Sequence, residues 1–278
     1  MVFKGLLVVI SGFLFIFASG VPMRLIARFR PNYKREGIYW GVGIWIIVFF
    51  ISTFMQNVIR KIVSGGVNNE PITSPWPFLL GAVLTTLFVQ IGMLIFLKKY
   101  RKQGEEVISG GLALGFGIGL IAQVFTGMIL ITAGAGVLLQ GFGVKLPVGI
   151  IQEVTLDLIS KESLFGLIAA LLSLILFRVA LLTVCAAQGY LVADSMLGRK
   201  RLFWFALLGY SAFTWLVFLL QILLGEENPG QVSLGLTSPL TSIVSAAYYL
   251  AVCILGYRWL SGELHSTDKK AIKARSKK

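Results

Sequence analysis

The sequence predicts an all-α fold, a polytopic bundle of about seven transmembrane helices. Two compositional observations support this prediction: 56% of the 278 residues are hydrophobic and only 13% are charged. Soluble globular domains are about 45–50% apolar and about 25% charged, so this chain has too little polar surface to cover a soluble fold. A third observation is that the apolar residues gather in runs of about 20, the length that crosses a bilayer as a helix.

Seven runs reach this length, and turn residues or clusters of charge separate them. They are residues 5–23, 38–59, 78–97, 108–139, 164–192, 203–224 and 240–260. The first run follows Lys4 like the apolar part of a signal peptide, but five basic residues follow it closely, so we expect an uncleaved span. The fourth and fifth runs are longer than a bilayer requires, which predicts tilt, a kink or a re-entrant portion.

The basic residues predict the orientation of these spans. Of the 25 Lys and Arg residues, 19 fall on one set of connecting segments and the C-terminal tail, five fall on the opposite set, and Arg178 lies inside the fifth run. Cytoplasmic loops carry the excess of Lys and Arg, so we expect the N-terminus outside and the C-terminus in the cytoplasm. Together these features predict a multi-pass protein of the plasma membrane.

The chain divides into a transmembrane helical domain, residues 1–260, and a basic cytoplasmic tail, residues 261–278. We expect the tail to be disordered or to lie on anionic lipid, where each Lys or Arg near the surface contributes about 1 kcal/mol. The net charge of +13 belongs to membrane-flanking loops and this tail, so it does not predict a nucleic-acid partner.

The apolar runs lack the residues that intramembrane chemistry usually requires. The single histidine, His265, is in the tail, and the twelve acids lie in loops, in the tail or at run ends, as Asp194 does. A catalytic zinc site takes His, Cys, Asp or Glu ligands, and an aspartyl protease needs two close carboxylates. A serine nucleophile needs a base, and a proton pump needs buried ionisable groups. We therefore predict no catalytic residues, no metal and no cofactor.

Four polar side chains remain inside the runs as candidate binding residues. They are Arg178, Gln90, Gln123 and Gln188. Arg178 lies roughly 21 Å from the outer end of its run at about 1.5 Å per residue, which is close to mid-bilayer. Such an arginine either bonds internal carbonyls or contacts an anion or an acid of another protein. The glutamines are interpreted first as hydrogen bonds between helices and second as ligand contacts.

A stripe of small residues predicts close helix packing in the fourth run. Gly111, Gly115 and Gly119 recur every four residues and therefore share one helix face, which lets another helix approach closely. The stripe does not identify whether that helix is internal or belongs to a partner. Cys185 and Cys253 both lie in apolar runs and are interpreted as packing residues.

Three segments of the chain, taken in order, form a pattern of glycine and apolar residues. They read Leu-Phe-Val-Gln-Ile-Gly-Met at 87–93, Gly-Phe-Gly-Ile-Gly at 115–119, and Phe-Arg at 177–178. Over spans three to six this order resembles the bacterial YhfC-like membrane proteins, which are thought to be intramembrane metalloproteases. In that family the segments read Leu-Phe-Glu-Glu-x-Gly-Arg, Gly-x-Gly-His-Gly with a glutamate three residues later, and Glu-Arg with a histidine seven residues beyond the arginine.

The chain departs from that pattern at each glutamate and histidine. Those positions hold Val89, Gln90, Ile118, Ala122, Phe177 and Cys185, and Met93 replaces the first arginine. The resemblance therefore implies a degenerate member, a pseudoenzyme that keeps the membrane scaffold of a protease and no metal site.

The sequence thus favours a non-catalytic integral membrane protein, a pseudoprotease-like scaffold that binds a membrane-protein partner or a lipid. The alternative is a passive transporter or permease component for a small solute, with Arg178 and the glutamines lining its path. An active hydrolase is the third and least favoured interpretation.

Overall fold

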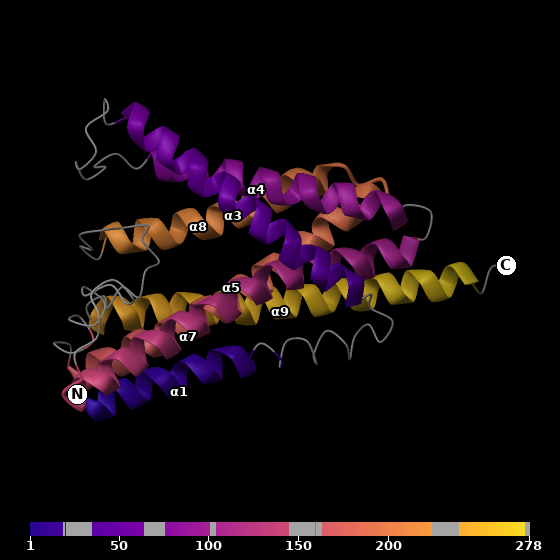
Figure 1. Cartoon of the computed structure of the whole chain (residues 1–278). Coiled ribbons are helices and arrows are strands. Elements are labelled where there is room, and N and C mark those ends of the chain that lie inside the picture. Colours follow the sequence, from indigo (N-terminus) through magenta and orange to yellow (C-terminus); the bar gives the residue numbers. More distant parts are fainter. Residues whose placement is uncertain are drawn as a thin grey trace. The chain divides into compact units, whose positions relative to one another are not determined.

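The computed structural model describes residues 1–18, 20, 35–63, 76–100, 104–144, 159, 163–223 and 239–275, and nearly all of them are helical (Figure 1). The helices are α1 (Val2–Ala18), α3 (Arg35–Val63), α4 (Trp76–Leu97), the 3-10 helix η1 (Lys98–Tyr100), α5 (Gly104–Gly141), α7 (Leu164–Met196), α8 (Arg201–Leu223) and α9 (Pro239–Arg275). No strand occurs among these residues, so the all-α prediction is confirmed for them.

Six of these helices are long and apolar enough to cross a membrane: α3, α4, α5, α7, α8 and α9. The chain is therefore a multi-pass membrane protein. The first predicted span is represented by α1, which is apolar but has 17 residues. The end of that predicted span, residues 21–23, lies outside the described residues.

Helices α5 and α7 are unbroken over 38 and 33 residues. The option of a re-entrant portion in these two runs was therefore wrong. At the start of α7 the Ser163 hydroxyl accepts a hydrogen bond from the Gly166 amide at 2.9 Å, a typical N-cap. Beyond α5, Gly143 takes a positive φ of 78° while Val144 N–H reaches back to the Leu139 carbonyl at 2.9 Å, which ends the helix as a Schellman motif.

Helix α9 continues through the boundary that we expected between membrane domain and tail. Its membrane-crossing stretch is Thr241–Gly262, yet the helix runs on to Arg275. The expectation of a disordered tail was therefore wrong as far as Arg275. The residues beyond Gly262 are rich in good helix formers such as Ala, Lys, Leu and Glu, which explains the continuation.

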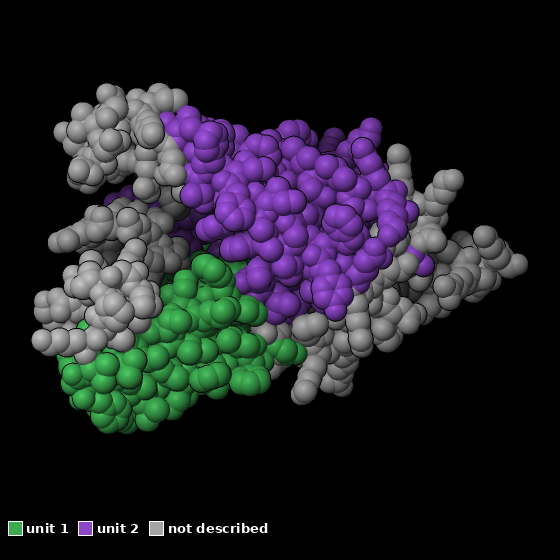
Figure 2. Space-filling model, in the orientation of Figure 1, with its two compact units in different colours: residues 1–32, 122–183, 232–278 green, residues 33–121, 184–231 purple. Residues whose placement is uncertain are grey.

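The chain forms two compact units, each built from separate stretches of sequence (Figure 2). Unit 1 comprises Met1–Asn32, Ala122–Thr183 and Val232–Lys278, and unit 2 comprises Tyr33–Ile121 and Val184–Gln231. Helices α5 and α7 each contribute one part to either unit, whereas α1 and α9 belong to unit 1 and α3, α4 and α8 to unit 2.

In unit 2, the first part of α5 packs against α7 with almost no side chains between the backbones. A Cβ added to Gly111 would meet the carbonyl of Gly189, and one added to Gly115 would meet the carbonyl of Cys185. Because Gly111 pairs with the later residue of α7 and Gly115 with the earlier one, these two helix segments are antiparallel. The same part of α5 runs parallel to α3. A Cβ added to Gly37 would meet the side chain of Ala113, and the contacts one turn later in α3 are with residues one turn later in α5.

In unit 1, the second part of α5 packs against α1 through glycines of both helices. A Cβ on Gly12 would lie 2.7 Å from the Gly127 carbonyl oxygen, and one on Gly134 would lie 2.8 Å from the Gly5 carbonyl oxygen. These pairings make α1 antiparallel to this part of α5. A buried cluster that includes Val8 and Phe15 of α1 with residues of α5 and α7 forms the apolar core of the unit.

Candidate functional site

Arg178 lies on α7 in unit 1, within a cluster of aromatic and hydroxyl groups. Its guanidinium carbon is 5.1 Å from the ring centroid of Phe177, and that ring is 5.1 Å from the ring of Tyr249 on α9. Tyr248 lies beside Tyr249 at 5.6 Å between centroids. We call Phe177, Arg178, Ser245, Tyr248 and Tyr249 the arginine–tyrosine cluster.

Helical periodicity explains why α9 presents these groups together. Ser245 and Tyr249 are four residues apart, so they lie on one face of α9, and both are buried. The two side chains share a hydrogen bond, and Tyr249 interacts electrostatically with Arg178. The guanidinium supplies only hydrogen-bond donors, and the two phenols and the serine hydroxyl can each donate or accept, a combination that can bind a ligand rich in acceptor oxygens, such as a carboxylate or phosphate.

Gln123 has the structural role that we expected first for the glutamines. It is buried on the unit 1 part of α5, and its Nε2 donates a hydrogen bond to the Phe15 carbonyl of α1 at 3.0 Å. The bond joins the two helices that the glycine contacts bring together. It lies on the α1 side of α5, whereas the described contacts of Arg178 are with α7 and α9.

Gln90 on α4 and Gln188 on α7 belong to unit 2 and are fully buried. Within the described part of the chain, neither the nitrogen nor the oxygen of either side-chain amide has a hydrogen-bond partner. Buried amides without partners are rare in native structures and often bind ordered water or a ligand. Ser211 of α8 is also buried in unit 2, and its hydroxyl also has no partner among the described residues. The sequence analysis did not identify it as a candidate, because a lone serine in an apolar helix carries no distinguishing pattern.

Gly111, Gly115 and Gly119 are all buried along α5. The first two contact α7 of the same unit, so the partner of this part of the stripe is internal. Cys185, which the sequence analysis interpreted as a packing residue, supplies the backbone that Gly115 contacts.

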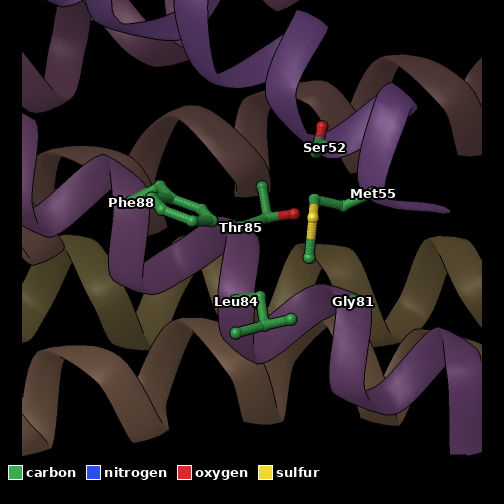
Figure 3. A pocket seen from close by; sticks show the side chains of 6 residues that line it. All are labelled: Ser52, Met55, Gly81, Leu84, Thr85 and Phe88. Atoms are coloured by element: carbon green, nitrogen blue, oxygen red, sulfur yellow. The ribbon is translucent and has the colours of Figure 1, made fainter. Parts of the chain in front are cut away.

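A small cavity lies between α3 and α4 in unit 2, and nothing in the sequence indicated it. Its walls are Ser52, Met55, Gly81, Leu84, Thr85 and Phe88 (Figure 3). The volume open to the centre of a water molecule is about 10 Å³, enough for about one water. The Ser52 hydroxyl donates to the Phe49 carbonyl at 3.1 Å, while the hydroxyl of Thr85 points towards Met55.

Two acids at helix ends are paired with basic residues. Glu36 at the start of α3 bonds Lys99 of η1 at 2.8 Å, and Asp194 near the end of α7 bonds Arg199 at 3.1 Å. Both ion pairs lie in unit 2. Over the ranges that the structure describes, no three His, Cys, Asp or Glu side chains gather as metal ligands would.

Comparison with known proteins gives no relative from which a function could be transferred. No protein-family model, curated protein or solved structure matches this chain.

Proposed function

We propose that this multi-pass membrane protein is a non-catalytic scaffold whose arginine–tyrosine cluster binds a membrane partner or a lipid. The observation that carries the proposal is the placement of Arg178 beside Tyr249, which is itself bonded to Ser245. The guanidinium is a hydrogen-bond donor and the hydroxyls can donate, and none of these groups is a carboxylate or histidine that could act as a general base near neutral pH. An acceptor group of a ligand, such as a carboxylate on a partner helix or a lipid phosphate, complements them.

The resemblance to the YhfC-like family supports the pseudoenzyme form of this proposal. The positions that carry its glutamates and histidines are occupied here by Val89, Gln90, Ile118, Ala122, Phe177 and Cys185, and each of these side chains is buried. A former intramembrane active site would have been built from buried positions such as these. Apolar or neutral replacements there are compatible with retained packing and lost chemistry.

The proposed orientation has seven alternating spans with the N-terminus outside. The antiparallel pairing of α1 with α5 and of α5 with α7, and the parallel pairing of α3 with α5, are those of a chain that alternates direction at each span. The ion pair of Glu36 with Lys99 favours one side of the membrane for the start of α3 and the end of α4. We propose the plasma membrane as the location.

The test compares wild type with Arg178→Leu, both purified in gentle detergent and analysed for co-eluting protein and lipid. We expect the variant to fold and to lose the bound partner, with Arg178→Lys retaining part of the binding. Arg258→Leu, an exposed arginine on α9, is the matched control and should retain the partner. Identical co-eluting material from wild type and Arg178→Leu would contradict the proposal.

A second candidate function, a passive permease component for a small polar solute, is favoured by one observation. Gln90 and Gln188 present amide groups to the interior of unit 2 without partners among the described residues. The test is solute flux into proteoliposomes. Flux that is abolished by Gln90→Leu or Gln188→Leu and left unchanged by Gln123→Leu would establish this function.

A further inference from the structure

Helices α3 and α4 of unit 2 run in opposite directions, so the start of α3 lies beside the end of α4. Glu36 at the start of α3 is paired with Lys99, directly after α4. Further along both helices, a Cβ added to Gly92 would lie 3.0 Å from Cγ2 of Ile44. We call the side of unit 2 where α3 starts and α4 ends the η1 end.

The other helix segments of unit 2 also start or stop at the η1 end. The start of α5 is there because this part of α5 runs parallel to α3, and the end of α7 is there because α7 is antiparallel to α5. The short connection 197–200 then brings the start of α8 to the same end. In agreement, the Trp215 indole in the second half of α8 donates a hydrogen bond to the Leu79 carbonyl near the start of α4 at 3.2 Å.

The membrane-crossing stretches of these helices also stop at the η1 end. They begin at Glu36, Glu106 and Arg201, and they end at Leu97 and Met196. Side chains at or just outside the limits of membrane-crossing stretches lie at the depth of the lipid headgroups. The η1 end of unit 2 therefore faces headgroups of one leaflet.

Exposed cations and exposed amphipathic aromatic side chains occur together at this end. They are Tyr39, Trp40, Lys98, Lys200, Arg201 and Trp204, which we call the interfacial belt. The side chains of Trp40 and Trp204 are 54% and 61% exposed. Next to the belt, Ile95 of α4 and Leu208 of α8 are exposed and apolar. A phospholipid has the same succession of a charged headgroup, an interface that favours indole rings, and apolar chains.

The cations of the belt are not neutralised by the acids of the described part of unit 2. The acids with described side chains at the η1 end are Glu36, Glu106 and Asp194, and each already interacts with another group. In contrast, Lys98, Lys200 and Arg201 form no ion pair with a described residue. Their positive charge is therefore available to an anionic group outside the chain.

We propose that the interfacial belt of unit 2 binds phospholipids with anionic headgroups. The cations contact the headgroup, and the indole rings lie where the headgroup meets the acyl chains. An acidic protein segment complements only the cations, whereas an anionic phospholipid complements the cations, the indoles and the neighbouring apolar surface. The proposal stands on unit 2 alone and does not depend on the arginine–tyrosine cluster.

The test is native mass spectrometry of the full-length protein in neutral detergent, titrated with phosphatidylglycerol or with phosphatidylcholine of identical acyl chains. We expect wild type to bind phosphatidylglycerol at least about fivefold more tightly, the preference that one Lys or Arg at a membrane surface provides. Neutralising the belt by Lys98→Gln, Lys200→Gln and Arg201→Gln together should reduce this preference by about fivefold or more. The matched control keeps the charges, with Lys98→Arg, Lys200→Arg and Arg201→Lys, and should keep the preference of wild type.

Both triple variants change exposed side chains only, so both should unfold at the temperature of wild type in neutral detergent. An unchanged preference in the neutralised variant, or an equal loss in the charge-conserving control, would overturn the proposal. Displacement of bound phosphatidylglycerol by a glutamate-rich peptide would instead assign the belt to an acidic protein. Displacement by soluble glycerol phosphate at the concentration of the lipid would show a site for free anions, and would equally refute lipid binding.

Discussion

Gly115 is the position at which the structure makes the sharpest prediction about stability. A Cβ added there meets the Cys185 carbonyl, lies 2.8 Å from its carbonyl carbon and lies 3.1 Å from the Cα of Ala186. All three are backbone atoms of α7, so no flexible side chain can move aside. Restoring an ordinary contact of at least 3.4 Å to the carbonyl carbon alone requires the two helix segments to separate by about 0.6 Å, and the carbonyl oxygen, which lies closer to the added Cβ, requires a larger separation.

The cost of that separation follows from the packing of unit 2. Overpacking a well-packed interior typically costs about 1–3 kcal/mol, and the intrinsic helix preference of alanine over glycine returns up to about 1 kcal/mol. We therefore expect Gly115→Ala to destabilise the protein by about 1–2 kcal/mol and Gly115→Ile by more. Gly209, on the exposed side of α8 with no atom of the described residues within 4 Å of its Cβ position, gives the opposite sign. Gly209→Ala should stabilise by up to about 1 kcal/mol.

The assay is thermal unfolding in mild detergent, followed by the loss of a monodisperse peak, for wild type, Gly115→Ala and Gly209→Ala. A difference in sign between the two alanine variants is the expected result. Equal shifts for both would refute the close approach of α5 and α7 at Gly115, because the intrinsic propensity change is the same at each site. Gly104→Ile, at the first residue of α5, gives a second control for the isoleucine variant and should be tolerated better.

Three further predictions use other parts of the chain. Gln123→Leu removes a hydrogen bond between α1 and α5 and should lower the stability of the protein by about 0.6 kcal/mol. Gln188→Leu removes an amide without a described partner and should leave stability unchanged or raise it. Equal destabilisation by the two substitutions in detergent melts would contradict this difference. A reporter fused after Lys278 should be cytoplasmic and one inserted at Asn69 external, and finding both on one side would exclude seven alternating spans. Metal analysis of the purified protein should find no stoichiometric zinc, since the apolar runs hold no histidine, and about one tightly held zinc per chain would restore the protease interpretation.

The membrane-spanning helices were predictable because a long apolar run in a helical membrane protein has few alternatives. The predicted run 108–139 lies within α5, Gly104–Gly141, and the predicted run 203–224 nearly coincides with α8, Arg201–Leu223. The continuation of α9 from Gly262 to Arg275 was not predicted, because hydropathy alone marks where a helix leaves the apolar layer and not where it ends. Its helix-forming composition contained that information.

The pairing of helices was not predicted, since it depends on contacts between residues far apart in the sequence. The glycine stripe of α5 indicated a close approach without a partner, and the structure supplies Gly189 and Cys185. A second signal was available and missed: glycines repeat every seven residues in α1, at Gly5 and Gly12, and in α5, at Gly127 and Gly134. Matching heptad spacings in two helices are what an antiparallel pair with a continuous contact line requires.

Buried polar atoms without partners among the described residues occur in both units, and the polar groups of each unit bear on a different candidate function. In unit 1 the Gln123 Nε2 bonds α1 while its Oε1 has no partner among the described residues, and Tyr249 bonds Ser245 beside Arg178, so part of this polar set holds a defined geometry to which a ligand can bind. In unit 2 Gln90, Gln188 and Ser211 are buried without partners among the described residues, an arrangement that is costly unless water or a solute reaches them. The scaffold proposal therefore depends on unit 1 and the permease alternative on unit 2. Substitutions at Arg178 and at Gln90 test the two proposals separately. Loss of partner binding with unchanged solute flux in the Arg178 variant would assign the function to the arginine–tyrosine cluster.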